Sequence, residues 1–143
     1  MKFKTCGLIL LFLFVLGLFF SNGSAFAAEI QWHSYDSGMA RGKFENKRVF
    51  LHFTAAWCYY CRAMDNKTFK DPAVISVLNE NFIAIRVDSD KERDTSSFYR
   101  VQGLPDTIFF SENGEIIDRR PGYITAEQLN LIIESILAMR SQK

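Results

Sequence analysis

The sequence predicts an α/β domain in which helices flank a central mixed β-sheet. Strand-like and helix-like segments alternate from residue 30 onward, in the order β-α-β-α-β-α-β-β-α. One segment, 49–53, is apolar at nearly every position, which is typical of a strand covered by helices on both faces. The last two strands flank Asn113-Gly114, a strong hairpin signal, so an antiparallel hairpin follows the parallel β-α-β units. With 143 residues, 48% of them hydrophobic, the chain has room for one such globular domain.

The first half of this fold contains two strands and three helical segments. Gly38 and Gly42 fall inside the first helix, where each costs about 1 kcal/mol relative to alanine. The helix that precedes the strand at 82–88 begins at Asp71-Pro72, because aspartate is a favoured N-cap and proline is favoured at the first helical position. The expected elements are a strand at 30–32, a helix at 36–46, a strand at 49–53, a helix at 58–69 and the helix that begins at 71–72.

The second half ends in a hairpin and a helix. Residues 82–88 alternate in polarity as a strand does, and a short helix covers 95–101. The hairpin strands are expected at 107–110 and 115–119. Thr125 and Gln128 form the pattern of a capping box and mark the beginning of the last helix.

The N-terminus has the three-part layout of a secretory signal peptide. Lys2 and Lys4 precede an apolar run over residues 7–20, and a small-residue pattern ends at Ala27. We expect residues 1–27 to be cleaved, which leaves a domain over residues 28–143 in the periplasm or another extracytoplasmic space. The alternative is a membrane anchor over residues 7–28, but a helical run of 14 residues rises roughly 21 Å, less than the roughly 30 Å of a bilayer core.

Charge and composition exclude several partners. Seventeen Lys and Arg against sixteen Asp and Glu give a net charge of +1, without the basic excess that nucleic-acid binding needs. No glycine-rich phosphate loop is present, so we expect no nicotinamide or flavin cofactor. We expect a monomer without a metal site.

A Cys-x-x-Cys pair lies where a buried strand ends and a helix begins. Cys6 falls in the expected signal peptide, so Cys58 and Cys61 are the cysteines of the mature domain. Their spacing in a first helical turn places both sulfurs on one side, close enough to bridge. The helix N-terminus stabilises a thiolate, which is the attacking species in thiol–disulfide exchange. A structural zinc site, which would need two more ligands, and a purely structural disulfide are the alternatives.

Further motifs accompany the cysteine pair. They are Trp57-Cys58, Thr68-Phe69-Lys70-Asp71-Pro72-Ala73-Val74, Leu78-Asn79-Glu80-Asn81-Phe82, Val87-Asp88 and Val101-Gln102-Gly103-Leu104-Pro105. With them the chain resembles the thioredoxin superfamily, and within it the subgroup that contains the C-terminal thioredoxin-like domain of the transmembrane thiol:disulfide interchange reductase. The resemblance implies a thioredoxin fold, a central mixed β-sheet flanked by helices.

The resemblance also implies roles for the residues of the site. It implies a disulfide oxidoreductase in which Cys58 is the nucleophile and Cys61 the resolving cysteine. Leu104 and Pro105 would present their backbone to a substrate strand, with a cis bond between them, because proline makes the cis form accessible.

Aromatic residues surround the pair. Trp57 is expected to pack beside the cysteines and to form the rim of the site, where it contacts substrate together with Tyr59 and Tyr60. The two residues between the cysteines tune the redox potential across the superfamily. The Tyr59-Tyr60 pair matches none of its familiar members and leaves the direction of exchange open.

Two further positions depart from the family pattern. Many members carry a buried aspartate six residues before the first cysteine as a proton relay, and this chain has His52 there. His52 either takes that role, because imidazole titrates near neutrality, or is a core histidine bonded to backbone. Asp106 follows Pro105 where threonine is usual, which puts an acid near the docking loop, and we expect it to cap the next strand or to face solvent rather than to select substrate.

The predicted function is the reduction of protein disulfides outside the cytoplasm. The expected partners are substrate proteins with disulfides and an external electron donor, such as a membrane thiol:disulfide reductase. One alternative is a disulfide oxidase or isomerase. Another is a soft-metal chaperone that carries copper on the same cysteines.

Overall fold

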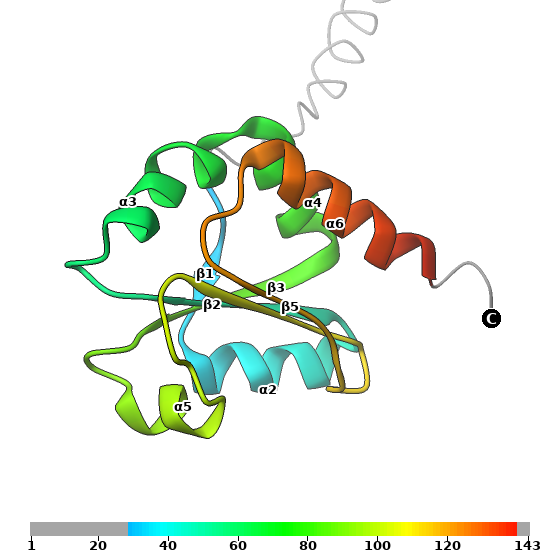
Figure 1. The fold of residues 1–143 in the computed structure, drawn as a ribbon. Coiled ribbons are helices and arrows are strands. Elements are labelled where there is room, and N and C mark those ends of the chain that lie inside the picture. The colour runs from blue at the N-terminus through cyan, green and yellow to red at the C-terminus, as the bar shows by residue number, and fades with distance from the viewer. Residues whose placement is uncertain (1–28, 140–143) are drawn as a thin grey trace, which may run out of the picture.

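A computed structural model describes residues 29–139 and has a five-stranded mixed β-sheet between two layers of helices (Figure 1). The elements are β1 (Trp32–His33), α2 (Tyr35–Glu45), β2 (Arg48–Thr54), α3 (Tyr59–Asn66), η1 (Thr68–Lys70), α4 (Pro72–Asn81), β3 (Phe82–Asp88), α5 (Arg93–Phe98), β4 (Asp106–Phe110), β5 (Ile116–Pro121) and α6 (Ala126–Ala138). The expected signal peptide, residues 1–27, lies outside the described residues. Within them, no helix is both long enough and apolar enough to cross a membrane.

The sheet has the strand order β1-β3-β2-β4-β5. Strands β1 and β2 are parallel to β3, whereas β4 is antiparallel to both β2 and β5, so the predicted parallel units and terminal hairpin are confirmed. Central strand β2 places His52 between Arg86 of β3 and Thr107 of β4. The carboxyl end of β2 leads through a short turn into α3, so this strand positions the N-terminus of that helix.

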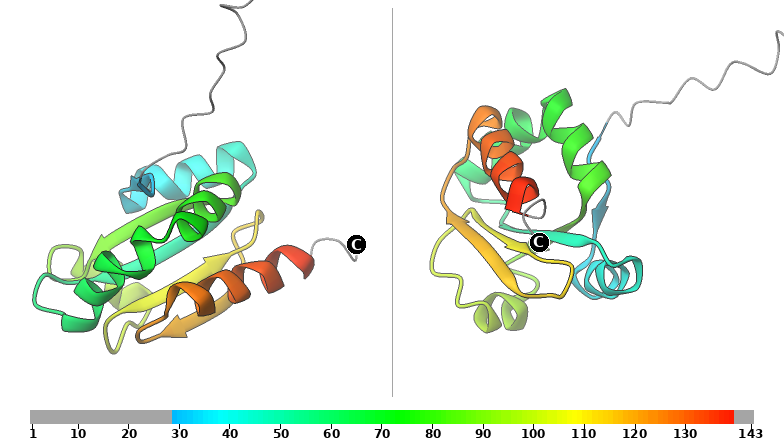
Figure 2. Two further views of the ribbon diagram at one scale, coloured as in Figure 1. Left: turned by 90° about the horizontal axis from the view of Figure 1, so that it is seen from above. Right: turned by 90° about the vertical axis from the view of Figure 1, so that its right-hand side faces the viewer.

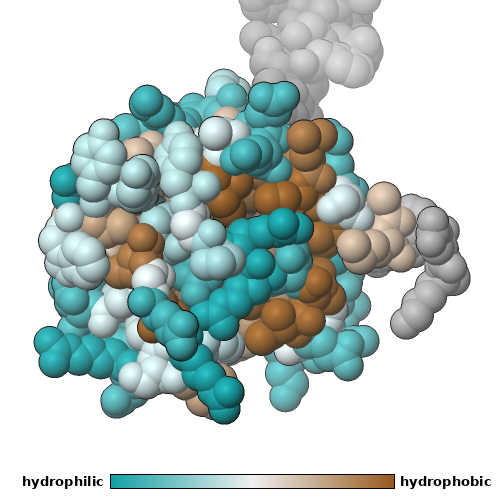
Figure 3. Space-filling view, in the orientation of Figure 1, coloured by the Kyte–Doolittle hydropathy of each residue, from teal (hydrophilic) through white to brown (hydrophobic). Residues whose placement is uncertain are grey.

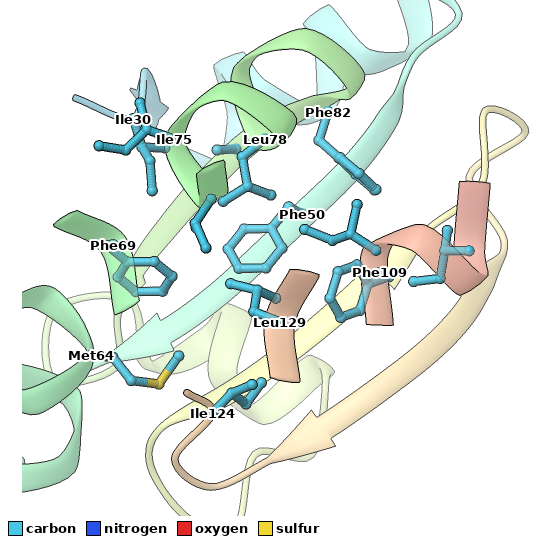
Figure 4. Close-up of a cluster of buried hydrophobic side chains, with 14 residues drawn as sticks. Ile30, Phe50, Met64, Phe69, Ile75, Leu78, Phe82, Phe109, Ile124 and Leu129 are labelled. Carbon is cyan, nitrogen blue, oxygen red and sulfur yellow. The ribbon is translucent and has the colours of Figure 1, made fainter. Parts of the chain in front are cut away.

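Alternate residues of β2 serve two separate cores. Leu51 and its neighbours on the same face pack towards α2 and the end of α5. Phe50 points to the opposite face, where α3, α4 and α6 lie (Figure 2). Figure 4 shows Phe50 at the centre of that second cluster, between Leu78, Phe109 and Leu129. Because both faces of β2 are buried, its near-continuous apolar sequence is explained.

The two glycines of α2 lie where the helix approaches the sheet closely. A Cβ atom on Gly38 would lie 2.3 Å from Cγ1 of Ile85, and one on Gly42 would lie 2.6 Å from Cγ2 of Val49. The glycines that weaken the helix locally therefore allow it to pack against β2 and β3.

Local capping signals are confirmed, and two helices end earlier than predicted, one of which, α5, ends at Phe98 rather than at residue 101. The Asp71 side chain accepts hydrogen bonds from the N–H groups of Ala73 and Val74, and the capping box of α6 is complete. The helix predicted over 58–69 ends at Asn66 and is followed by the 3₁₀ turn η1. That turn buries Thr68, whose hydroxyl donates to the carbonyl of Ile124 at 2.6 Å.

Candidate active site

The cysteine pair lies at the N-terminus of α3. Cys58 is the N-cap residue of the helix and is bonded to Cys61 in a disulfide, with the two Cα atoms 5.3 Å apart. The bond confirms that the two sulfurs lie close enough to bridge. Strand β2 and a short turn hold Cys58 at this place, because the N–H of Cys58 donates to the carbonyl of Ala55 at 3.1 Å.

The N-terminus of α3 provides a positive electrostatic potential at the Cys58 sulfur. The N–H of Cys61 donates to Sγ of Cys58 at 3.2 Å. An N-cap sulfur also faces the positive end of the helix dipole. Both effects stabilise negative charge on this sulfur more than on that of Cys61, which lies inside the helix. Cys58 is 4% exposed and Cys61 is 1% exposed, so Cys58 is also the more accessible of the two.

Exposed aromatic side chains form a rim beside the disulfide. Trp57, Tyr59 and Tyr60 are all more than half exposed, and the Trp57 indole donates to Asp90 at 2.9 Å. The ring of Tyr60 lies 6.2 Å from that of Tyr123, measured between centroids. Figure 3 shows residues of intermediate hydropathy, which are nearly white, over the side of the molecule that carries α3. The faces of these rings can contact an apolar side chain of a partner.

The loop before β4 lies against the cysteines. The Leu104–Pro105 peptide bond is cis, as expected. The Leu104 side chain packs on the cluster that contains Cys58 and Cys61. The carbonyl of Pro105 accepts a hydrogen bond from Gly122 at 2.7 Å, whereas the backbone of Leu104 forms no hydrogen bond within residues 29–139. Leu104 therefore has backbone groups available to an added strand.

His52 is fully buried on the helix face of β2 that also carries Phe50. Its Nδ1 lies 3.0 Å from Oγ1 of Thr107, and its ring centroid lies 4.9 Å from that of Phe69. Its Nε2 has no hydrogen-bond partner among the described residues. Burial, followed by the positive charge of Arg86, lowers the pKa of His52 to about 3. The ring is therefore neutral at physiological pH.

Arg86 is held beside His52 by an aromatic ring and a carboxylate. Its guanidinium carbon lies 4.2 Å from the ring centre of Trp32, and one of its nitrogens lies 2.6 Å from Oδ1 of Asp65. Asp65 belongs to α3, so the ion pair links the helix of the cysteine pair to strand β3.

A sequence profile for the thioredoxin-like domain matches residues 35–137. The chain belongs to the thioredoxin-like domain family. The thiol:disulfide interchange protein DsbD of Campylobacter jejuni strain RM1221 is 36% identical over 92 residues, which are 62% of this chain and 16% of that protein. A thioredoxin of Mycoplasmoides gallisepticum is 28% identical over 62% of this chain and 84% of its own length. The chain spans at most 16% of several of the curated relatives that it matches.

Solved structures of thioredoxin-like proteins share the fold. A thioredoxin from Thermus thermophilus superposes with a TM-score of 0.70 at 23% identity, over 76% of this chain and 88% of its own. An oxidoreductase named DsbH superposes with a TM-score of 0.65 at 19% identity, over 82% of this chain and 89% of its own.

In this thioredoxin-like domain, Asp106 is buried at the first position of β4, so the expectation that it faces solvent is wrong. The residue is 2% exposed, and its two carboxylate oxygens accept three hydrogen bonds from the guanidinium of Arg119, at 2.5 to 3.2 Å. These bonds raise the pKa of Arg119 further above its ordinary value. The arginine that neutralises Asp106 comes from β5, the strand that follows the hairpin turn.

Tyr123 is a rim residue that the sequence does not single out. It lies in the loop between β5 and α6, sixty-two residues after Cys61. The fold brings it to Tyr60, and no local pattern marks it. No group of three or more His, Cys, Asp or Glu side chains that could hold a metal ion occurs in the part of the chain that the structure describes.

Proposed function

We propose that this thioredoxin-like protein exchanges disulfides with other proteins in the periplasm or another extracytoplasmic space, with net reduction of the substrate. The observation that carries the proposal is the Cys58–Cys61 disulfide at the N-terminus of α3, with the Cys61 N–H directed at Sγ of Cys58. The signal-peptide pattern of residues 1–27 supports export. The resemblance to the thioredoxin-like domain of the transmembrane thiol:disulfide interchange reductase favours the reducing direction.

The exchange has two steps. The Cys58 thiolate of the reduced protein attacks one sulfur of the substrate disulfide, which forms a mixed disulfide and releases the other substrate sulfur as a thiolate. Cys61 then loses its proton and attacks Sγ of Cys58, which breaks the mixed disulfide and releases the second substrate thiolate. Two electrons pass to the substrate, and the protein is left with the Cys58–Cys61 disulfide. A protein dithiol, such as that of a membrane thiol:disulfide reductase, then reduces it.

The substrate lies along the loop that carries Leu104 and Pro105. An extended segment can pair with the free backbone groups of Leu104, which places its disulfide beside Cys58. The aromatic rim of Trp57, Tyr59 and Tyr60 contacts the side chains of that segment.

The first test separates the roles of the two cysteines. In the reduced protein, limiting iodoacetamide at neutral pH should alkylate Cys58 first, because its thiolate receives the Cys61 N–H and the helix dipole. Cys61→Ser should accumulate mixed disulfides with substrate proteins, whereas Cys58→Ser should accumulate none. Mass spectrometry of tryptic peptides measures both outcomes. Preferential alkylation of Cys61 would reverse the assignment.

His52 is the group that we assign to proton transfer from Cys61. Its neutral ring has an unpartnered Nε2, which can accept a proton. An imidazole with a pKa of about 3 is a weak base towards a thiol, so we take the low end of the usual general-base range, about 100-fold, as the largest contribution that His52 can make. His52→Leu should lengthen the life of the mixed disulfide by up to about this factor across pH 6 to 9 (conditions that we propose), measured by stopped flow, and leave the first attack nearly unchanged. An unchanged lifetime would reduce His52 to a packing residue.

The equilibrium potential of the Cys58–Cys61 couple tests the direction of exchange. A potential near −270 mV would support net reduction, and one near −120 mV would support the oxidase alternative. The N-terminal sequence of the protein isolated from its native cells tests export, because cleavage after Ala27 leaves Ala28 as the first residue.

A further inference from the structure

The loop that carries Leu104 and Pro105 is closed at its base by one arginine. Arg119 extends from β5 and donates to the carboxylate of Asp106, the residue that follows Pro105. The same guanidinium donates to the carbonyl of Tyr99 at 2.9 Å and to that of Arg100 at 3.4 Å. Arg119 therefore joins the two ends of the loop, which are separated in sequence by the five residues 101–105.

The chemistry of Asp106 and Arg119 explains why their contacts hold the base of the loop firmly. Asp106 is almost fully buried, so its carboxylate would be costly to leave without a charged donor. Guanidinium is a planar group with five N–H donors, so it alone can bind the carboxylate and two carbonyls at once, which an ammonium group cannot do in the same geometry. Arg100, next to these contacts, has a φ of 52°, so the backbone turns sharply at the point where Arg119 holds it.

We infer that Asp106 and Arg119 are positioning residues, which hold the loop 101–105 in the shape that presents Leu104 to a polypeptide substrate. Neither residue belongs to the cysteine cluster. Their effect is to fix the backbone of Leu104 before substrate arrives, so less conformational freedom is lost when a strand binds. The inference rests on the proposed disulfide exchange and predicts that a polypeptide disulfide depends on Asp106 and Arg119 more than a small disulfide does.

The test compares a polypeptide disulfide with a small one, using the full chain. Insulin is a polypeptide substrate that can extend along the loop, and dithiothreitol serves as the reductant. The small disulfide 5,5′-dithiobis(2-nitrobenzoate) contacts only the Cys58 sulfur. In Asp106→Asn and in Arg119→Lys, the KM for insulin should rise about tenfold while kcat stays within a factor of about two, because a loosened loop weakens docking and not chemistry. The reaction rate of each reduced variant with the small disulfide should stay within about a factor of two of the parent rate.

Arg120→Lys is the matched control. Arg120 is the next residue of β5 and makes a 2.9 Å ion pair with Asp118, but its side chain is half exposed and does not reach the loop. Its KM for insulin should stay at the value of the parent protein. Should Asp106→Asn fail to fold, Arg119→Lys still tests the inference, because Arg119 is one-third exposed and the substitution keeps its charge.

Three outcomes are distinguishable. A raised KM for insulin with an unchanged small-disulfide rate, together with faster amide hydrogen exchange in residues 101–104, supports the positioning role. An unchanged KM in the folded variants, or equal losses on both substrates, overturns it. If the parent protein itself reduces neither substrate, the proposed disulfide exchange fails instead.

Discussion

The stability of this protein depends on pH through the protonation of one buried histidine, His52. In the unfolded chain, His52 binds a proton near its ordinary pKa of 6.5, whereas in the folded protein it stays neutral down to a pH of about 3. Between these values the unfolded state holds more protons, so stability falls as the pH falls. The stability that the neutral, buried His52 contributes is fully present above pH 6.5 and is lost progressively as the pH falls towards 3.

We therefore expect His52→Leu to flatten the acid side of the stability profile. Between pH 7 and pH 4 the parent protein should lose about 3 kcal/mol more of its free energy of unfolding than the variant loses, at up to about 1.4 kcal/mol per pH unit. Urea unfolding at each pH, followed by circular dichroism, measures the difference. His33→Gln removes the other histidine and serves as the control, and it should keep the parent profile. Parallel profiles for the parent protein and His52→Leu would contradict the prediction.

Single residues differ in how far the sequence identifies them. Cys58 and Cys61 were predictable, because their spacing and their place at a strand–helix junction are local features. The burial of His52 followed from its place in an apolar strand. The environment of Asp106 was not predictable, because its partner Arg119 lies beyond a hairpin, and only the pairing of β4 with β5 brings the two together.

The packing of α2 on the sheet depends on glycine. Alanine is the better helix former by about 1 kcal/mol, yet a methyl group on Gly38 would meet the side chain of Ile85 at 2.3 Å. We expect Gly38→Ala to lower the free energy of unfolding by about 1–3 kcal/mol, the usual range for overpacking. Ala40→Gly, at an exposed position of the same helix, measures the effect of helix propensity alone and should lower the free energy of unfolding by about 1 kcal/mol. A more stable Gly38→Ala would show that the helix can move away from β3.

At the level of elements, locally encoded features were predictable and tertiary ones were not. Asp71 and the pair Thr125 and Gln128 mark helix starts through contacts within three residues, and the structure confirms them. The end of α3 at Asn66 was not predicted. The turn that follows it is held by the hydrogen bond from Thr68 to Ile124, which depends on the folded chain.

The whole domain should unfold as one unit, because β2 belongs to both cores. Phe50→Ala should cost about 3–5 kcal/mol and Leu51→Ala about 2–5 kcal/mol, although the two side chains point to opposite faces. Each variant should show one transition in denaturant, with the same midpoint by far-ultraviolet circular dichroism and by amide hydrogen exchange. A separate early transition of α2 and α5 in Leu51→Ala would show that the two layers fold independently.

The ends of the sheet bear on how the molecule behaves among unfolded chains. A sheet edge exposes unpaired N–H and C=O groups that can recruit a foreign strand and start aggregation. Here one edge, β1, has two residues, and the other, β5, carries Asp118, Arg119 and Arg120 and ends at Pro121. Short length, charge and proline all discourage edge-to-edge pairing. For the proposed exchange with polypeptides, these features leave Leu104, rather than a sheet edge, as the place where a substrate strand is added.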